Sequence, residues 1–128
     1  MNQSYESLLV WQKSHQLAIS VYKTTQGFPK EESFGLTSQL RRASLSVPTN
    51  IAEGFARNNP NVFKTFLDIS YGSLVETKYL LKFATEVGYL KPAKSEELIE
   101  LAESAGGLLW KFTQSLKERR PERITDHR

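Results

Sequence analysis

The chain has 128 residues, no cysteine and a net charge of +3, and these facts exclude several classes of protein. A domain of this size can bury a core without disulfides or metals, and a chain without cysteine has no thiolate zinc site and no cysteine nucleophile. No apolar run approaches the roughly 18 residues of a membrane span, and the N-terminus has no signal-peptide pattern, so we expect a cytoplasmic protein without membrane contact.

The first predicted helix runs from about Leu8 to Gln26. Trp11, Ala18 and Thr25 recur at heptad spacing on one face. Gly27 and the Phe28-Pro29 pair end this helix, and an eight-residue connector over residues 28–35 follows.

The second predicted helix carries a proline in its middle. A single face holds Leu36, Leu40, Ala43, Val47, Ile51 and Gly54. Thr37 is the expected N-cap residue. Pro48 removes a backbone hydrogen bond and costs roughly 3 kcal/mol relative to alanine. We therefore expect a bent helix that packs against a specific neighbour.

The third and fourth predicted helices have clear boundary signals. Asn59 suits an N-cap, Pro60 suits the first helical position, and Gly88 suits a left-handed residue that ends the third helix. The fourth helix begins between Pro92 and Ser95. We expect it to fray after Pro121.

These four helices predict an all-α fold, since no strand pattern competes with them. Short connectors place neighbouring helices antiparallel, which predicts an up-down-up-down four-helix bundle. The bundle is expected to cover residues 1–120, and residues 121–128 form a charged tail.

Two of the helices are apolar beyond their core faces. Such a helix is either deeply buried or forms an oligomer seam, and we favour the oligomer because helices of a four-helix monomer keep a solvent face. The predicted interface comprises Leu45, Pro48, Ala52, Phe55, Val62, Ile69, Leu80 and Val87.

The histidines and carboxylates do not predict an enzyme, a metal site or a cofactor site. A di-iron bundle needs Glu-x-x-His pairs, and neither His15 nor His127 has a glutamate three residues before it. His15 is expected to be half-buried beside Trp11. Glu53 and Glu76 either form a general acid–base pair or make structural hydrogen bonds at helix contacts.

The charges are unevenly distributed, with basic regions at 33–64 and 105–128 on either side of an acidic one. This pattern indicates either a polyanionic partner or an ordinary solvated surface. Arginine binds phosphate through a planar fork. Alternatively, Arg41 or Arg42 is a structural ion-pair partner of Glu53 or Glu76. The candidate nucleic-acid-binding residues are Arg41, Arg42, Arg57, Lys64, Lys117, Arg119, Arg120 and Arg123.

Several segments together carry a family resemblance that extends to about Leu116. They are Val10-Trp11, Tyr22 to Pro29, Phe34 to Thr37, Gln39 to Ala43, Ser46 to Pro48, Asn50 to Gly54, Phe66-Leu67, Gly72-Ser73 with Glu76, and Gly88-Tyr89. In these segments the chain resembles the four-helix-bundle proteins encoded in intervening sequences of bacterial 23S ribosomal RNA genes. The accessory protein of diversity-generating retroelements shares that fold.

The resemblance implies a homopentameric, non-enzymatic bundle that binds nucleic acid or a ribonucleoprotein, with structured RNA as the first candidate. It implies no catalytic residues. The alternative is a protein-interaction scaffold that docks a partner, such as a reverse transcriptase, without binding nucleic acid itself.

Overall fold

The computed structural model describes the backbone of residues 4–126 and the side chains of residues 4–117. Four α-helices are present: α1 (Leu9–Thr25), α2 (Leu36–Ala56), α3 (Pro60–Glu86) and α4 (Pro92–Asp126). Two short 3-10 turns, η1 (Tyr5–Ser7) and η2 (Lys30–Glu32), precede α1 and α2. No strand occurs within residues 4–126, so the predicted all-α fold is confirmed.

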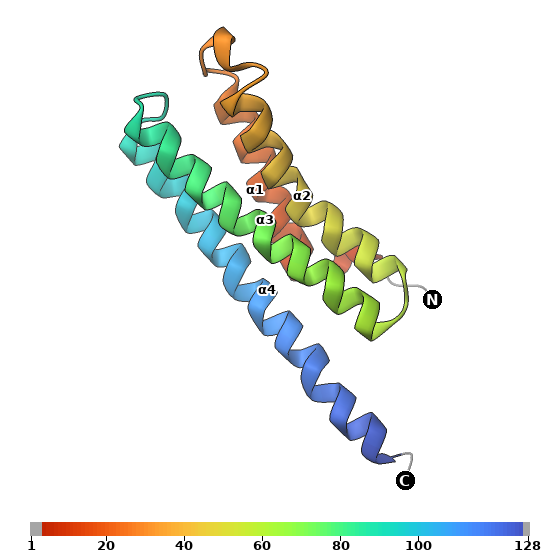
Figure 1. Cartoon of the computed structure of the whole chain (residues 1–128). Helices are drawn as coiled ribbons and strands as arrows, with labels where there is room; N and C mark the ends of the chain where they lie inside the picture. The colour runs from red at the N-terminus through yellow and green to blue at the C-terminus, as the bar shows by residue number, and fades with distance from the viewer. Residues whose placement is uncertain (1–3, 127–128) are drawn as a thin grey trace.

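The helices pack as a four-helix bundle. Helix α2 contacts α1 and α3, and α4 contacts α3 and α1, so each helix has two neighbours. The α1–α2 and α3–α4 connections lie at one end of the bundle and the α2–α3 connection at the other (Figure 1). This alternation of ends is what the expected up-down-up-down order requires.

Helix α4 is the longest element and extends beyond the other three (Figure 1). Its 35 residues correspond to about 52 Å. It continues past Pro121 to Asp126, whereas the sequence predicted fraying after that proline. The division into a bundle over 1–120 and a tail over 121–128 stays a prediction.

The boundary signals of α3 are confirmed. The Asn59 side chain accepts hydrogen bonds from the backbone N–H groups of Asn61 and Val62, at 3.0 and 3.2 Å. Pro60 is the first residue of the helix. Gly88 has a φ of 89°, the left-handed conformation expected after a helix end.

The predicted N-cap of α2 is wrong. The helix begins at Leu36, so Thr37 lies inside its first turn, where it is buried. Glu32 caps the helix instead, because the η2 turn brings its carboxylate under the first turn. Its Oε1 accepts from the Leu36 N–H at 3.0 Å, and its Oε2 accepts from the Tyr89 hydroxyl at 3.0 Å.

The core consists of two apolar clusters. The larger includes Leu17, Leu40, Leu81 and Leu98, one from each helix, and the smaller is centred on Ile51 with Phe63, Leu67 and Leu109. Each helix contributes the face that its 3.6-residue period predicts.

Pro48 lies inside α2 and is buried, and α2 runs without interruption from Leu36 to Ala56. On the neighbouring α3, the Ser70 hydroxyl donates to the carbonyl of Val47 at 2.8 Å. This bond ties α3 to the backbone beside the proline. The expected bend itself stays a prediction.

Candidate functional site

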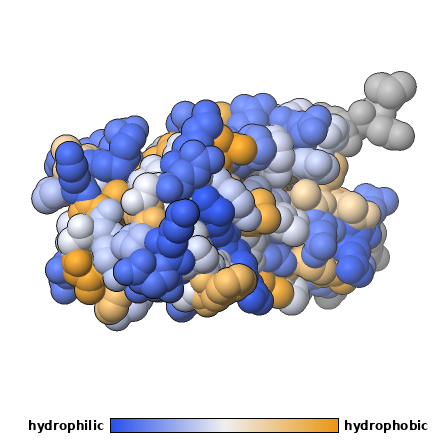
Figure 2. Space-filling view, turned by 90° about the horizontal axis from the view of Figure 1, so that it is seen from above, coloured by the Kyte–Doolittle hydropathy of each residue, from blue (hydrophilic) through white to orange (hydrophobic). Residues whose placement is uncertain are grey.

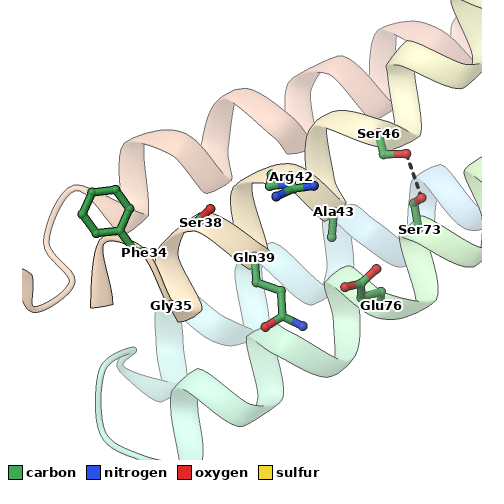
Figure 3. Close-up of a pocket in the computed structure, with 9 residues that line it drawn as sticks. All are labelled: Phe34, Gly35, Ser38, Gln39, Arg42, Ala43, Ser46, Ser73 and Glu76. Carbon is green, nitrogen blue, oxygen red and sulfur yellow. Dashed lines mark hydrogen bonds between the residues drawn. The ribbon is translucent and has the colours of Figure 1, made fainter. Parts of the chain in front are cut away.

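A groove of about 520 Å³ lies between α2 and α3. Its walls are mostly polar, and one aromatic ring stands at its edge (Figure 3). The lining residues are Phe34, Gly35, Ser38, Gln39, Arg42, Ala43, Ser46, Ser73 and Glu76.

Helix geometry brings these side chains together. Gln39, Arg42 and Ser46 follow one another at spacings of three and four, so they share the face of α2 that borders α3. Ser73 and Glu76 are likewise three residues apart on α3. Figure 3 shows Gln39 and Glu76 extending from the two helices towards the gap between them.

One end of the groove is closed by hydrogen bonds. The Ser73 hydroxyl donates to the Ser46 hydroxyl at 2.9 Å, across the two helices. The Asn50 amide donates to both the carbonyl and the hydroxyl of Ser46, each at 2.8 Å. These contacts hold α2 and α3 in a fixed register at this end.

The other end is open and carries Phe34 (Figure 3). The Phe34 side chain is 100% exposed, although phenylalanine normally packs in a core. Arg42, Gln39 and Glu76 are exposed between the two ends. Within residues 4–117, none of these three side chains makes a hydrogen bond or ion pair, so their polar groups are available to a ligand.

Arg41 has a structural role, unlike its neighbour Arg42. Its Nε donates to the Thr25 hydroxyl at 2.7 Å, and its Nη2 donates to the Tyr22 carbonyl at 3.1 Å. The guanidinium also lies 4.6 Å from the centre of the Tyr22 ring. Arg41 is therefore the arginine with a structural role. Its hydrogen-bond partners are Thr25 and Tyr22 on α1, and not Glu53 or Glu76 as predicted.

The other predicted basic residues do not gather around the groove. Arg57 caps the far end of α2 and lies over the Phe66 ring at 5.0 Å. Fifteen residues of helix separate it from Arg42, about 22 Å. Lys64 is half-buried on α3 and Lys117 is exposed on α4. The side chains of Arg119, Arg120 and Arg123 lie outside the described residues.

In the described part of the chain, Glu53, Glu76 and His15 do not come together in one site. Glu76 lines the groove and Glu53 does not, and no hydrogen bond joins them. His15 stacks on the Trp11 ring at 4.7 Å, as expected, but it is exposed rather than half-buried. No group of three or more His, Asp or Glu residues in the described chain could hold a metal ion.

The predicted interface residues differ widely in exposure. Leu45, Ile69 and Val87 are exposed, whereas Ala52, Phe55 and Val62 are half-buried. Pro48 and Leu80 are buried within the chain itself. The predicted oligomer interface itself stays a prediction.

Sequence reasoning missed most of the exposed apolar side chains. A helical wheel of the full length of α3 could have found four of them, because they lie between its core face and its predicted second face. Figure 2 shows apolar groups scattered among hydrophilic ones on one side of the molecule. The missed residues are Leu9, Ile19, Tyr22, Phe34, Tyr71, Val75, Tyr79, Phe83 and Trp110.

A second, more apolar groove of about 320 Å³ lies between α3 and α4. It is lined by Tyr71 and Val75 on α3 and by Gly106, Gly107 and Trp110 on α4. Apart from its chain neighbours and the adjacent backbone of α4, no atom lies within 4 Å of the position that a Cβ of residue 107 would take, so the α4 backbone is open here. A partner could approach this backbone closely.

The comparisons with known proteins agree with this fold. The family model described as 23S rRNA-intervening sequence protein matches residues 6–111. The chain belongs to this family. A crystal structure of a protein of unknown function from the S23 ribosomal protein family of Bacteroides thetaiotaomicron has the same fold. It aligns with a TM-score of 0.74 and 22% identity over 82% of this chain and 98% of that one.

No curated protein matches the chain. Within the described residues, none of the helices combines the length and the apolar character that crossing a membrane requires.

The α2/α3 groove coincides with the segments that carry the resemblance to this family. Of its nine lining residues, only Ser38 lies outside those segments. Several motif residues that do not pack in the core, such as Gln39, Arg42 and Glu76, thus meet on one surface of this family member.

Proposed function

We propose that this member of the 23S rRNA-intervening sequence family is a homo-oligomeric helical scaffold that binds RNA and is not an enzyme. The main support for this proposal is the number of exposed apolar side chains on α3. Six of the twelve exposed large apolar side chains in the described chain belong to α3 or its C-cap residue: Ile69, Tyr71, Val75, Tyr79, Phe83 and Val87.

A helix that is apolar on its core face and also on its outer face needs a further partner to exclude water from it. Complete burial of a large apolar side chain from full exposure contributes on the order of 1.5–3 kcal/mol. The six side chains are 43–62% exposed, so covering each of them contributes about half of that. A second copy of the chain is the simplest partner, and a closed ring covers the same patch on every copy. We propose a pentamer, as the family resemblance implies.

The RNA-binding part rests on the exposed basic residues. Arg42, Arg57 and Lys117 have exposed side chains on different parts of the bundle. With a net charge of only +3, a single protomer would bind RNA weakly, but a ring repeats every contact and adds them by multivalency.

Two measurements test this function. Light scattering at micromolar concentration should report about five times the 14.6 kDa mass of the chain. A monomer would contradict the scaffold, and a dimer would contradict the pentamer. Affinity for a structured RNA should fall linearly with salt on a double-logarithmic plot, and absence of binding at roughly 50 mM salt would contradict the RNA role.

A triple variant, Arg119→Gln with Arg120→Gln and Arg123→Gln, tests the basic C-terminal region separately. We expect it to remain folded and oligomeric but to bind RNA more weakly, with a shallower salt dependence. An unchanged affinity would remove these three residues from the interface.

The α3/α4 groove favours a second candidate function, a protein-interaction scaffold. Trp110, Tyr71 and the open Gly107 backbone suit a helix of a partner such as a reverse transcriptase, because small residues allow close approach and aromatic residues anchor interfaces. In this case Trp110→Ala should abolish binding to the purified partner. It should leave the RNA affinity unchanged.

A further inference from the structure

Phe34 is an aromatic ring held out into solvent by an ordered loop. The Gly35 N–H donates to the Glu32 carbonyl at 2.9 Å, and the Ser33 N–H donates to the Lys30 carbonyl at 3.0 Å. The Glu32 carboxylate bonds both Leu36 and Tyr89, which fixes the loop to α2 and to the α3–α4 connection. The ring contributes nothing to the core, and these hydrogen bonds fix the backbone that carries it.

Arg42 and Glu76 lie along the same groove with their charges uncompensated. Neither makes an ion pair within the described residues, where the ion pairs are Lys78–Glu103 and Lys94–Glu97. The adjacent Arg41 instead donates two hydrogen bonds to residues of α1, so the two arginines differ in their contacts. An arginine that is free in a groove can bind a phosphate with two parallel hydrogen bonds.

Glu76 restricts the ligand that the groove can take. A simple anion next to Arg42 would also face the Glu76 carboxylate, which repels it. A carboxylate accepts hydrogen bonds, so it suits a ligand with a hydroxyl or amine donor a short distance from its negative charge. A ribonucleotide has this pattern, because its 2′-hydroxyl donates and its phosphate is anionic.

The groove is also long enough for such a ligand. From Leu36 to Ser46, α2 advances by about 15 Å, with Phe34 just before this stretch and the Ser46–Ser73 bond at its other end. Ser38 and Gln39 add a hydroxyl and an amide between these ends, and both can bond a base edge or a sugar.

We propose that the α2/α3 groove binds an unpaired ribonucleotide of the RNA. Its base stacks on Phe34, its phosphate is bound by Arg42, and its 2′-hydroxyl donates to Glu76. This inference rests on the proposed RNA-binding function and assigns that function to one site. Stacking on an aromatic ring tolerates any base, so the site reads unpaired RNA rather than sequence.

The first experiment separates stacking from charge by fluorescence anisotropy with a labelled single-stranded oligouridine. Phe34→Ala should weaken binding by about tenfold or more and leave the salt dependence unchanged. Arg42→Gln should weaken binding and reduce the slope of log affinity against log salt by about one per occupied groove. Ile19→Ala and Lys23→Gln are matched controls on α1, where both side chains are exposed, and they should bind as the wild type does.

The second experiment tests the sugar contact. The wild type should bind oligouridine more tightly than oligodeoxyuridine, because DNA lacks the 2′-hydroxyl. Glu76→Ala should reduce this ratio, whereas Glu53→Ala, an exposed carboxylate outside the groove, should preserve it. An unchanged ratio in Glu76→Ala would overturn the proposed role of Glu76.

The outcomes show whether the proposed binding site or the RNA-binding function itself is wrong. If the wild type binds RNA and both Phe34→Ala and Arg42→Gln bind equally well, the groove is not the site, although the RNA-binding function stands. If the wild type binds no RNA at low salt, both proposals fail. Light scattering on Phe34→Ala completes the test, because a change in oligomer mass would make Phe34 a subunit contact and overturn the site.

Discussion

Gly54 shows how one missing side chain sets the distance between two helices. A Cβ at this position would lie 2.7 Å from Cδ1 of Phe63 and 2.7 Å from Cβ of Phe66, both on α3. The Phe66 Cβ is attached to the backbone, so it can move only if α3 moves. The absence of a side chain at residue 54 therefore permits the close packing of α2 on α3.

Gly54→Ala should lower the free energy of unfolding by roughly 1–3 kcal/mol, because the overpacking outweighs the helix-propensity gain of about 1 kcal/mol. Gly107→Ala is the matched control. It lies inside α4 with open space around it, so the same change should stabilise the protein by about 1 kcal/mol. Urea unfolding of both variants measures the difference, and equal effects would contradict the packing argument.

The Tyr89–Glu32 hydrogen bond predicts a pH dependence of stability. The bond to the Glu32 carboxylate, together with partial burial and the charges of Glu32 and Glu31, raises the pKa of Tyr89 above its usual 10.0. A raised pKa in the folded state means that the neutral phenol is favoured there. Its contribution is complete below about pH 10 and is lost as the pH rises through the folded-state pKa.

The wild type should therefore lose its stability advantage over Tyr89→Phe when the pH rises beyond the raised pKa. Melting temperatures of the two proteins across this range measure the effect, and isotope-labelled tyrosine NMR follows the phenol itself. If the difference between the two melting temperatures stays constant with pH, the hydrogen bond to Glu32 does not set the pKa of Tyr89.

At the scale of the element, α2 combines three roles on one helix. Its core face packs Leu40, Val47 and Ile51, its α1 side carries Arg41, and its α3 side forms the groove with Arg42 and Ser46. A proline in the middle of such a helix affects the alignment of all three surfaces.

Pro48→Ala should accordingly be neutral or destabilising. The propensity gain of about 3 kcal/mol is offset because Pro48 is buried, and because straightening the predicted bend would misplace Ile51, Ala52 and Phe55. Thermal unfolding and light scattering test this together. A large rise in melting temperature with an unchanged assembly would argue against a helix built around its proline.

At the scale of the whole molecule, the proposed oligomer depends on the outer face of α3. Ile69 on α3 and Ile19 on α1 have similar exposures, 50% and 42%, but only Ile69 belongs to the large apolar surface of α3. A charge introduced at an interface costs far more than one introduced at a free surface.

Ile69→Glu should therefore reduce the mass of the assembly, whereas Ile19→Glu should leave it unchanged. Circular dichroism should show that both variants keep their helix content. If both variants retain the wild-type mass, the subunit contact does not include the middle of α3.

Local signals in the sequence predicted most of the fold. The four helices, the cap at Asn59 and Pro60, and the left-handed Gly88 follow from residues that act within one turn of the backbone. The core faces follow from the 3.6-residue period, because burial repeats with the helix itself. The segments that carry the family resemblance were also visible in the sequence alone.

The tertiary structure decided which side chains meet. Arg41 bonds Thr25, sixteen residues away, and Glu32 bonds Tyr89, fifty-seven residues away. Tertiary packing also buries Leu80 and brings Arg42 and Glu76 to the same groove. Each of these outcomes depends on how one helix is rotated against another, and residue type and spacing along a single helix do not set that rotation.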